Sequence, residues 1–175
     1  ARLWSVATGS PLGPALVHPH QVEAATLAAD GKTVVTGCYD GFVRIFDAET
    51  GQLSGEAVDT GTLVREVQLA VNDRVAVARN NSGRILLIDV AGARPLAEQL
   101  PDGAAVSAFA IRPDGQQLVT AAAKSPGLEL WSLPDLAQGH TTISADDRFE
   151  QIAFSPDGQW LAAAGSTAVR VWRTD

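Results

Sequence analysis

Short runs in which apolar and polar residues alternate follow one another along the whole chain, with turn residues between them. Alternation with a period of two is typical of a β-strand that buries one of its faces. The runs keep one order: an alternating run, a turn, a β-rich run, a tight link, a third run and a looser fourth. The first runs are Val22–Ala28, Val64–Val71, Val106–Ile111 and Phe149–Phe154. This pattern predicts an all-β chain in which each repeat supplies four short strands.

Two landmarks recur along the chain with the same period. The apolar residue that closes each third run recurs in steps of 42, 42, 43 and 41 residues, at Trp4, Phe46, Ile88, Trp131 and Trp172. The turn after each first run keeps this spacing, at Asp30-Gly31, Asn72-Asp73, Asp114-Gly115 and Asp157-Gly158. A β-type repeat of about 40–45 residues is typical of a propeller blade. The spacing therefore predicts a chain of propeller blades.

The strand count predicts about four blades, arranged as an open partial propeller. The expected divisions are 1–17 (the end of a preceding blade), 18–59, 60–102, 103–144 and 145–175 (a blade without its outer strand). The N-terminal piece supplies a third and a fourth strand, Arg2–Ser5 and Leu12–Val17, and the last blade supplies a third strand as well. Two third strands would compete for one place in a simple ring. We therefore expect an open arc cut from a larger propeller, with open ends that allow self-association.

Composition narrows the class of partner and the compartment. The 175 residues carry a net charge of −7 and no basic stripe, which argues against nucleic acid as a partner. The single cysteine, Cys38, allows no internal disulfide and favours a cytoplasmic location. The longest apolar stretch, Ala104 to Ile111, is far shorter than the roughly 20 residues of a membrane-spanning helix. Methionine is absent, so we expect a fragment from inside or from the end of a longer protein.

Several motifs together resemble WD40 repeats, over the whole chain. The fourth repeat contains Ser155-Pro156-Asp157-Gly158 and then Val169-Arg170-Val171-Trp172. The first full repeat contains Asp30-Gly31-Lys32 and Asp40-Gly41-Phe42-Val43-Arg44-Ile45-Phe46-Asp47. The resemblance implies WD40-type blades, each built from four antiparallel strands.

The resemblance also implies a buried hydrogen-bonded network in each blade, made by His, Ser or Thr, Asp and Trp. The first full repeat matches it with His18, Thr36 and Asp40, while Phe46 replaces the Trp and has no N–H to donate. We interpret these three residues as a structural network, with Asp40 as the acceptor for His18, and not as a nucleophile with its base. The later repeats keep little of the pattern, and Ala145 stands where the fourth would have His. We expect apolar packing to hold those repeats.

Other candidate sites carry weaker patterns. His18, His20, Cys38 and Asp40 come close together in the implied fold, but their spacing matches no standard zinc motif. We therefore expect no metal and no cofactor. His140 is expected to begin an outer strand.

For partner binding, the resemblance points to the loops that precede first strands and follow second strands. The residues at these positions are His20, Glu23, Tyr39, Arg65, Arg79, Arg148 and Glu150. Tyr and Arg are residue types that often anchor protein interfaces. We predict that a protein or peptide partner contacts this set.

The leading hypothesis is a non-enzymatic interaction platform, the sensing or scaffolding part of a larger bacterial protein. Its repeats, such as Gly9-Ser10-Pro11-Leu12-Gly13 leading to His18, resemble those of large bacterial WD40 proteins. The alternative is a propeller enzyme, a hydrolase or oxidoreductase with a central metal or cofactor. Such an enzyme needs convergent acidic or His ligands, whereas the inner strands carry Thr26, Gln68, Ser107 and Gln151. A lectin-like half-propeller has only Trp160 and Tyr39 as possible sugar platforms.

Overall fold

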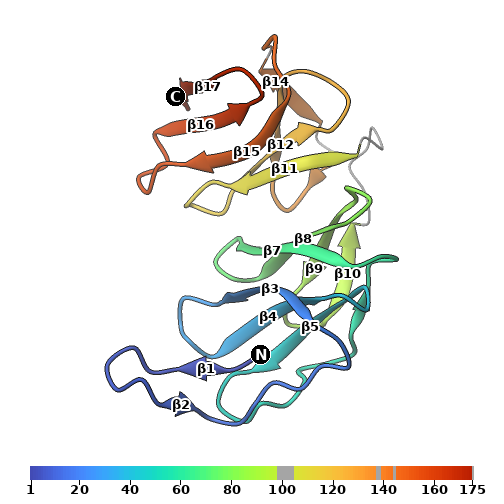
Figure 1. Ribbon diagram of the computed structural model, residues 1–175, viewed down its shortest axis with the longest axis vertical. Helices are drawn as coiled ribbons and strands as arrows, with labels where there is room; N and C mark the ends of the chain where they lie inside the picture. The colour runs from blue at the N-terminus through green and yellow to red at the C-terminus, as the bar shows by residue number, and fades with distance from the viewer. Residues whose placement is uncertain (98–104, 137–138, 144, 175) are drawn as a thin grey trace. The chain divides into compact units, whose positions relative to one another are not determined.

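The computed structural model describes residues 1–97, 105–136, 139–143 and 145–174 (Figure 1). These residues form short β-strands joined by turns, in agreement with the alternating pattern. The chain divides into two compact units, and we describe each by itself. The first unit comprises Ala1–Leu69, Asp73–Asn81 and Leu86–Leu96. The second unit comprises Ala70–Asn72, Ser82–Ile85 and Ala97–Asp175.

The first unit holds two four-stranded sheets and a short strand pair. Blade 1 is the sheet β3–β4–β5–β6, with strands Val22–Leu27, Thr33–Cys38, Phe42–Asp47 and Val58–Asp59. Blade 2 is the sheet β7–β8–β9–β10, with strands Val64–Ala70, Val75–Asn80, Ile85–Asp89 and Arg94–Ala97. Before them, β1 (Leu3–Trp4) pairs antiparallel with β2 (Pro11–Leu12).

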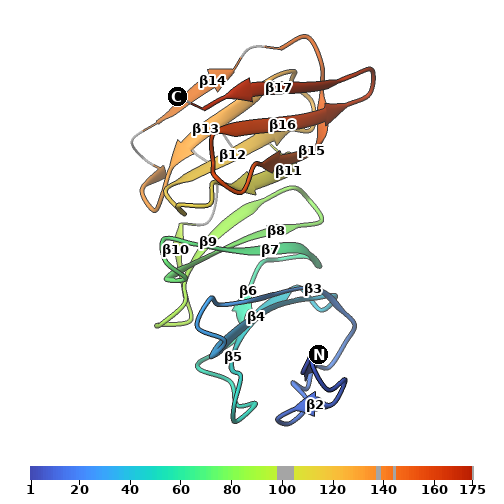
Figure 2. The ribbon, with the colours of Figure 1, turned by 90° about the vertical axis from the view of Figure 1, so that its left-hand side faces the viewer.

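The second unit holds one four-stranded and one three-stranded sheet. Blade 3 is the sheet β11–β12–β13–β14, with strands Val106–Ile111, Gln117–Ala122, Leu128–Ser132 and His140–Ile143. Blade 4 is the sheet β15–β16–β17, with strands Phe149–Phe154, Trp160–Gly165 and Val169–Arg173. Figure 2 shows β17 at the edge of this sheet, beside β16.

Neighbouring blades of the first unit pack face to face. Val35 and Ile45 of blade 1 and Val64 and Val67 of blade 2 belong to one apolar cluster and are at most 5% exposed. Covering a side chain of this size contributes about 1.5–3 kcal/mol relative to leaving it in water. Gly37 lies at the point of closest approach, because an added Cβ there would clash with the side chain of Val64. The first strand of one blade thus covers the sheet of the blade before it.

The second unit repeats this packing. Val119 and Leu128 of blade 3 cluster with Phe149 and Leu161 of blade 4, and all four side chains are at most 1% exposed. The hydroxyl oxygen of Ser107 lies 2.8 Å from the carbonyl oxygen of Phe149, which adds a polar contact between the two blades.

The prediction of an all-β fold with about four WD40-type blades is confirmed. The strands before blade 1 are shorter than predicted: Leu3–Trp4 within Arg2–Ser5, and Pro11–Leu12 where Leu12–Val17 was expected. Gly13 has a positive φ of 63° and Pro14 has no N–H, so the ladder cannot continue past Leu12. The open arc stays a prediction. The proposed divisions at 102/103 and after 144 lie outside the described residues.

Candidate functional site

His18 and Thr36 form a contact between the segment before blade 1 and the second strand of that blade. His18 Nδ1 lies 2.9 Å from the carbonyl oxygen of Leu16, which can only accept, so Nδ1 carries the proton. Burial lowers the pKa of His18, which keeps Nε2 unprotonated near neutral pH. The hydroxyl of Thr36, which is fully buried, therefore donates to Nε2 over 2.8 Å. The ring of Phe46 packs against the ring of His18, with centroids 5.1 Å apart. Phe46 thus keeps the ring contact, but it has no N–H to donate as the Trp of the WD40 pattern would.

Asp40 does not receive a hydrogen bond from His18; its partner is Arg44. Arg44 Nη1 donates to Asp40 Oδ1 over 3.1 Å and Nη2 donates to Oδ2 over 2.7 Å. The backbone N–H of Phe42 also donates to Oδ1, over 3.1 Å. The hydrogen bond from the guanidinium is the main reason that the pKa of Asp40 falls to about 2. Both side chains are nearly buried, at 11% and 12% exposed. This pairing joins the turn after β4 to β5.

The later blades also carry polar networks, so the expectation that apolar packing alone holds them is wrong. In blade 2, the amide nitrogen of Asn80 donates to the carbonyl oxygen of Thr60 over 2.6 Å, and both residues are buried. In blade 3, Trp131 Nε1 donates to the hydroxyl of Thr120 over 3.0 Å. Blades 2 and 3 therefore each join buried polar groups through a residue pair of their own.

In blade 4, Asp147 holds the loop between β16 and β17. No sequence motif marked this residue. Its carboxylate accepts hydrogen bonds from Thr167 Oγ1 over 2.8 Å, from Ser166 Oγ over 3.1 Å and from the backbone N–H of Arg148 over 2.8 Å. These bonds, led by the one from Thr167, lower the pKa of Asp147 to about 2. An added Cβ at Gly165 would lie 2.5 Å from Asp147 Oδ2, so the absence of a side chain there leaves room for the carboxylate.

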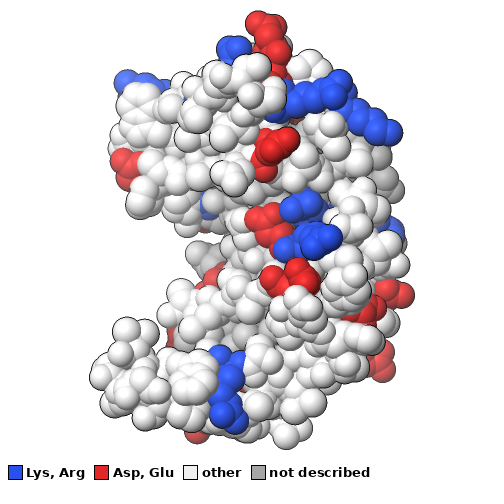
Figure 3. Space-filling view, in the orientation of Figure 1, with Lys and Arg blue, Asp and Glu red and all other residues white. Residues whose placement is uncertain are grey.

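The candidate partner residues of the first unit lie among paired charges. Arg65 Nε donates to Asn81 Oδ1 over 2.9 Å, and Arg65 Nη1 lies 3.6 Å from Glu23 Oε2. Arg79 Nη2 lies 3.4 Å from Glu66 Oε2, while Arg79 Nε is buried and has no hydrogen-bond partner among the described residues. Figure 3 shows acidic and basic side chains side by side over the β7 and β8 region. The structure thus brings together the charged residues of β3, β7 and β8.

The remaining candidates are exposed and lie in both units. Tyr39, in the turn after β4, is 53% exposed, and its backbone N–H donates to the carbonyl oxygen of Gln21 over 2.8 Å. His20 is exposed before β3. In the second unit, Arg148 and Glu150 are exposed on either side of the buried Phe149.

The described part of the chain also bears on the other candidate sites. Within those residues, no group of three or more His, Cys, Asp or Glu side chains has the arrangement to hold a metal ion. The same residues contain no helix long and apolar enough to cross a membrane.

Sequence comparison agrees with the repeat architecture. The family model described as "WD domain, G-beta repeat" matches residues 14–47 and 136–173, which include most of blade 1 and all of blade 4. These two segments are WD40 repeats. The matched segments contain His18, Thr36 and Asp40 of the first WD40 repeat and Asp147 of the last.

Two known proteins illustrate how far the similarity extends. The chain is 28% identical over 201 residues to the small ribosomal subunit protein RACK1 of Candida albicans, an alignment that covers 89% of this chain and 62% of that protein. A crystal structure of the computationally designed Ika8 protein matches with a TM-score of 0.76 and 20% identity, over 98% of this chain and 52% of that one. The second match concerns the fold alone. The chain thus spans only about half to two thirds of the length of these two proteins.

Proposed function

We propose that this chain is a non-enzymatic platform that binds a protein or peptide partner. The observation that carries this proposal is the arrangement of charges in the first unit, where Arg65 is held by Glu23 and Asn81 beside the pair Arg79 and Glu66. Side chains held in place before binding lose less conformational freedom when a partner arrives. WD40 repeats commonly form protein-interaction scaffolds, which supports the same conclusion.

Tyr39 supplies the aromatic anchor of the proposed surface. It is half exposed, and its backbone is fixed by the hydrogen bond to Gln21. Tyrosine and arginine are both enriched in the central part of protein interfaces. The acidic chain, with a net charge of −7, favours a partner segment with some basic character, while Arg65 and Arg148 can receive acidic groups.

The wider setting is part of the proposal. The repeats resemble those of large bacterial WD40 proteins, so we place this chain in the sensing or scaffolding part of such a protein, in the cytoplasm. The name of the matched yeast protein assigns that protein to the small ribosomal subunit. We do not extend this assignment to an RNA contact here, because the chain carries 20 acidic against 13 basic residues and no basic stripe.

The experiment uses the purified chain to capture proteins from an extract of the source cells. The proteins captured by the parent chain and by single variants are compared by quantitative mass spectrometry. Tyr39→Ala tests the surface of the first unit and Arg148→Ala tests that of the second. Leu53→Ala, at an exposed position outside the candidate set, is the matched control. A partner that the parent and the control capture, and that one of the test variants loses, supports the proposal. If all variants capture the same proteins in the same amounts, the proposed surface is wrong.

The alternative, a propeller hydrolase or oxidoreductase with a central metal or cofactor, has a separate test. Metal analysis and absorption spectroscopy of the purified chain would detect a bound metal in stoichiometric amount or a coloured cofactor. Either finding would favour the enzyme over the platform.

A further inference from the structure

A hollow of about 320 Å³ lies between blades 1 and 2, within the first unit. Its lining comes from both blades and combines an apolar floor with a polar rim. Blade 1 contributes Thr33, Ile45 and Ser54, and blade 2 contributes Asp73, Arg74 and Val90. We call these six residues the interblade hollow. An apolar cavity of this size with a few convergent polar groups is typical of sites that bind small molecules.

The floor of the interblade hollow continues the apolar core between the two blades. Ile45 belongs to the buried cluster that both blades share and is 2% exposed, and Val90 packs against the same cluster. Both side chains are aliphatic. The floor can therefore take an aliphatic group of a ligand out of water, which favours binding.

Asp73 supplies a fixed negative charge at the rim. The backbone N–H of Ala29, in blade 1, donates to Asp73 Oδ2 over 2.7 Å and holds the carboxylate between the two blades. Among the residues that the structure describes, no group donates to Asp73 Oδ1 and no cation pairs with this carboxylate. The other carboxylate at the hollow, Asp89, already has a partner, because Arg94 Nε lies 3.4 Å from Asp89 Oδ2. Asp73 is thus the carboxylate that is available to a ligand.

The rim also carries a positive charge that Asp73 does not neutralise. Arg74 follows Asp73 in the turn between β7 and β8 and is exposed. Within the described ranges, its guanidinium has no hydrogen-bond or ion-pair partner, and neither hydroxyl of Thr33 and Ser54 has a hydrogen bond. The hollow thus offers one carboxylate, one guanidinium and two hydroxyls that can donate or accept.

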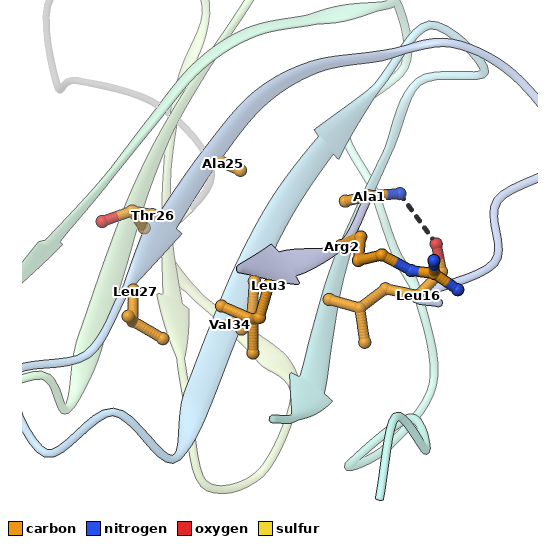
Figure 4. Close-up of a pocket in the computed structure, with 8 residues that line it drawn as sticks. All are labelled: Ala1, Arg2, Leu3, Leu16, Ala25, Thr26, Leu27 and Val34. Carbon is orange, nitrogen blue, oxygen red and sulfur yellow. Dashed lines mark hydrogen bonds between the residues drawn. The ribbon is translucent and has the colours of Figure 1, made fainter. Parts of the chain in front are cut away.

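A second hollow in the first unit has a different lining. Figure 4 shows this hollow, of about 160 Å³, with Leu3 of β1 beside Val34 and with Leu27 on the neighbouring strand. Arg2 and Thr26 are the polar side chains among its lining residues, and none of these residues has a carboxylate. The second hollow therefore has no group to hold a cation, whereas the interblade hollow carries both signs of charge.

We propose that the interblade hollow binds a free α-amino acid with an aliphatic side chain. The ammonium group of the ligand pairs with Asp73 and its carboxylate pairs with Arg74, so both charges of the hollow gain a partner. Its side chain lies against Ile45 and Val90. A molecule with only one of the two charges would leave either Asp73 or Arg74 without a partner, and would bind less tightly.

This site is separate from the proposed partner surface and does not depend on it. Arg65 and Arg79 stand near the start of β7 and near the end of β8, whereas Asp73 and Arg74 lie in the turn at the other ends of these strands. The ligand contacts residues of both blades, so it binds only while the two blades are packed together. Binding should therefore stabilise the folded first unit against unfolding.

The first test is a titration of the isotope-labelled chain with L-leucine, followed by NMR. The amide signals of Thr33, Asp73 and Val90 should shift with one common dissociation constant. The amide signal of Leu27, at the second hollow, should stay in place and serves as the control within the same molecule. If these signals do not shift up to the solubility limit of L-leucine, the proposal is wrong.

The second test compares L-leucine with three matched ligands, each of which lacks one of its parts. Isoamylamine lacks the carboxylate, isocaproic acid lacks the ammonium group, and glycine lacks the aliphatic side chain. Each should bind more weakly than L-leucine, by roughly tenfold or more for the loss of a charged hydrogen-bond partner. Equal affinity for isoamylamine or isocaproic acid would show that the hollow selects a single charge, which contradicts the assignment of an amino acid. Equal affinity for glycine would contradict the role of the apolar floor.

The third test removes the two charges of the hollow one at a time. Asp73→Asn keeps an oxygen that can accept from the N–H of Ala29, and Arg74→Gln changes an exposed side chain, so both variants should fold. Each should weaken the binding of L-leucine by roughly tenfold or more. Arg170→Gln, at an exposed arginine of blade 4, is the matched control and should bind like the parent. Unchanged affinity in Asp73→Asn or in Arg74→Gln would overturn the proposed pairing.

The urea midpoint provides a readout of the same binding event that does not need signal assignments. A saturating concentration of L-leucine should raise the midpoint of the parent, and the same concentration should raise that of Asp73→Asn less. Circular dichroism without ligand confirms that each variant is folded. A midpoint of the parent that L-leucine leaves unchanged would contradict binding to the folded state.

Discussion

Both terminal nitrogens of the Arg44 guanidinium donate hydrogen bonds to the carboxylate of Asp40, Nη1 to Oδ1 over 3.1 Å and Nη2 to Oδ2 over 2.7 Å. The two residues stand at the start of β5 and in the turn before it, four positions apart. Because two parallel hydrogen bonds fix both position and orientation, this pair defines the conformation of the turn that also presents Tyr39.

Asp40→Ala should lower the free energy of unfolding by about 1–3 kcal/mol, because it leaves the nearly buried guanidinium of Arg44 and the N–H of Phe42 without their acceptor. Urea denaturation followed by circular dichroism measures the change. Glu56→Ala, at an exposed position, is the control and should change the midpoint little. Equal midpoints for the parent and Asp40→Ala would show that the pair does not form.

Asp147→Ala should lower the urea midpoint more than Ser166→Ala. The carboxylate accepts hydrogen bonds from several groups, whereas Ser166 contributes only one of them. Thr167→Val should lie between the two, since it removes the shortest of the side-chain bonds. The order of the three midpoints is the result to check, and a Ser166→Ala variant as unstable as Asp147→Ala would contradict it.

Stability should fall in acid because of Asp40 and Asp147. Both carboxyls have a pKa of about 2 in the folded chain, below the ordinary value of 3.8. The folded state therefore holds fewer protons, and its advantage is complete above about pH 4 and is lost as the pH falls toward 2. Urea midpoints measured from pH 7 to pH 2 should show this loss. The double variant Asp40→Asn, Asp147→Asn should show a flatter curve, and an unchanged curve would rule out these two groups as the cause.

Protonation of His18 should also destabilise the first unit. Burial lowers the pKa of His18 below 6.5, so the folded state favours the neutral ring that accepts from Thr36. The stability that this provides is present above pH 6.5 and declines as the pH falls through the lowered pKa. Titration of the His18 ring protons by NMR measures the pKa directly. A value at or above 6.5 would contradict the predicted loss of stability on protonation of His18.

Thr120→Val should destabilise blade 3 by about 1–3 kcal/mol, because it leaves the buried Trp131 N–H without an acceptor. Thermal unfolding followed by tryptophan fluorescence measures the effect. Thr142→Val, on the exposed strand β14, is a matched control that makes the same chemical change without touching a buried donor. Similar losses in both variants would mean that the Trp131 bond contributes nothing specific.

The blades could be predicted from the sequence because their signals are local. The turn Asp157-Gly158 and the run Val169–Trp172 mark strand ends by residue type alone, and the equivalent positions in the other repeats agree. The lengths of strands β1 and β2 were overestimated. The apolar residues of Leu12–Val17 suggest a strand, but Pro14 has no backbone N–H to donate to its neighbour.

Side-chain partners were harder to predict, since they depend on direction in space. Arg44 follows Asp40 by four residues on a strand and gave no signal as its partner. Asp147 gave no signal, because it lies two residues after Ala145, the position at which the WD40 pattern has His. Thr120 could have been found, since it aligns with Thr36 in the repeat.

The polar contacts of the four blades have a consequence for how the chain tolerates change. A loop and a neighbouring strand or turn are tied together by His18 with Thr36 in one blade and by Asp147 with Thr167 in another, with similar lengths of 2.8 Å. Both hydrogen bonds thus have the same structural role, although different residue types make them. A loop carrying a new recognition sequence could be installed in one blade without redesign of the others, provided that it brings its own acceptor or donor for the turn that it meets.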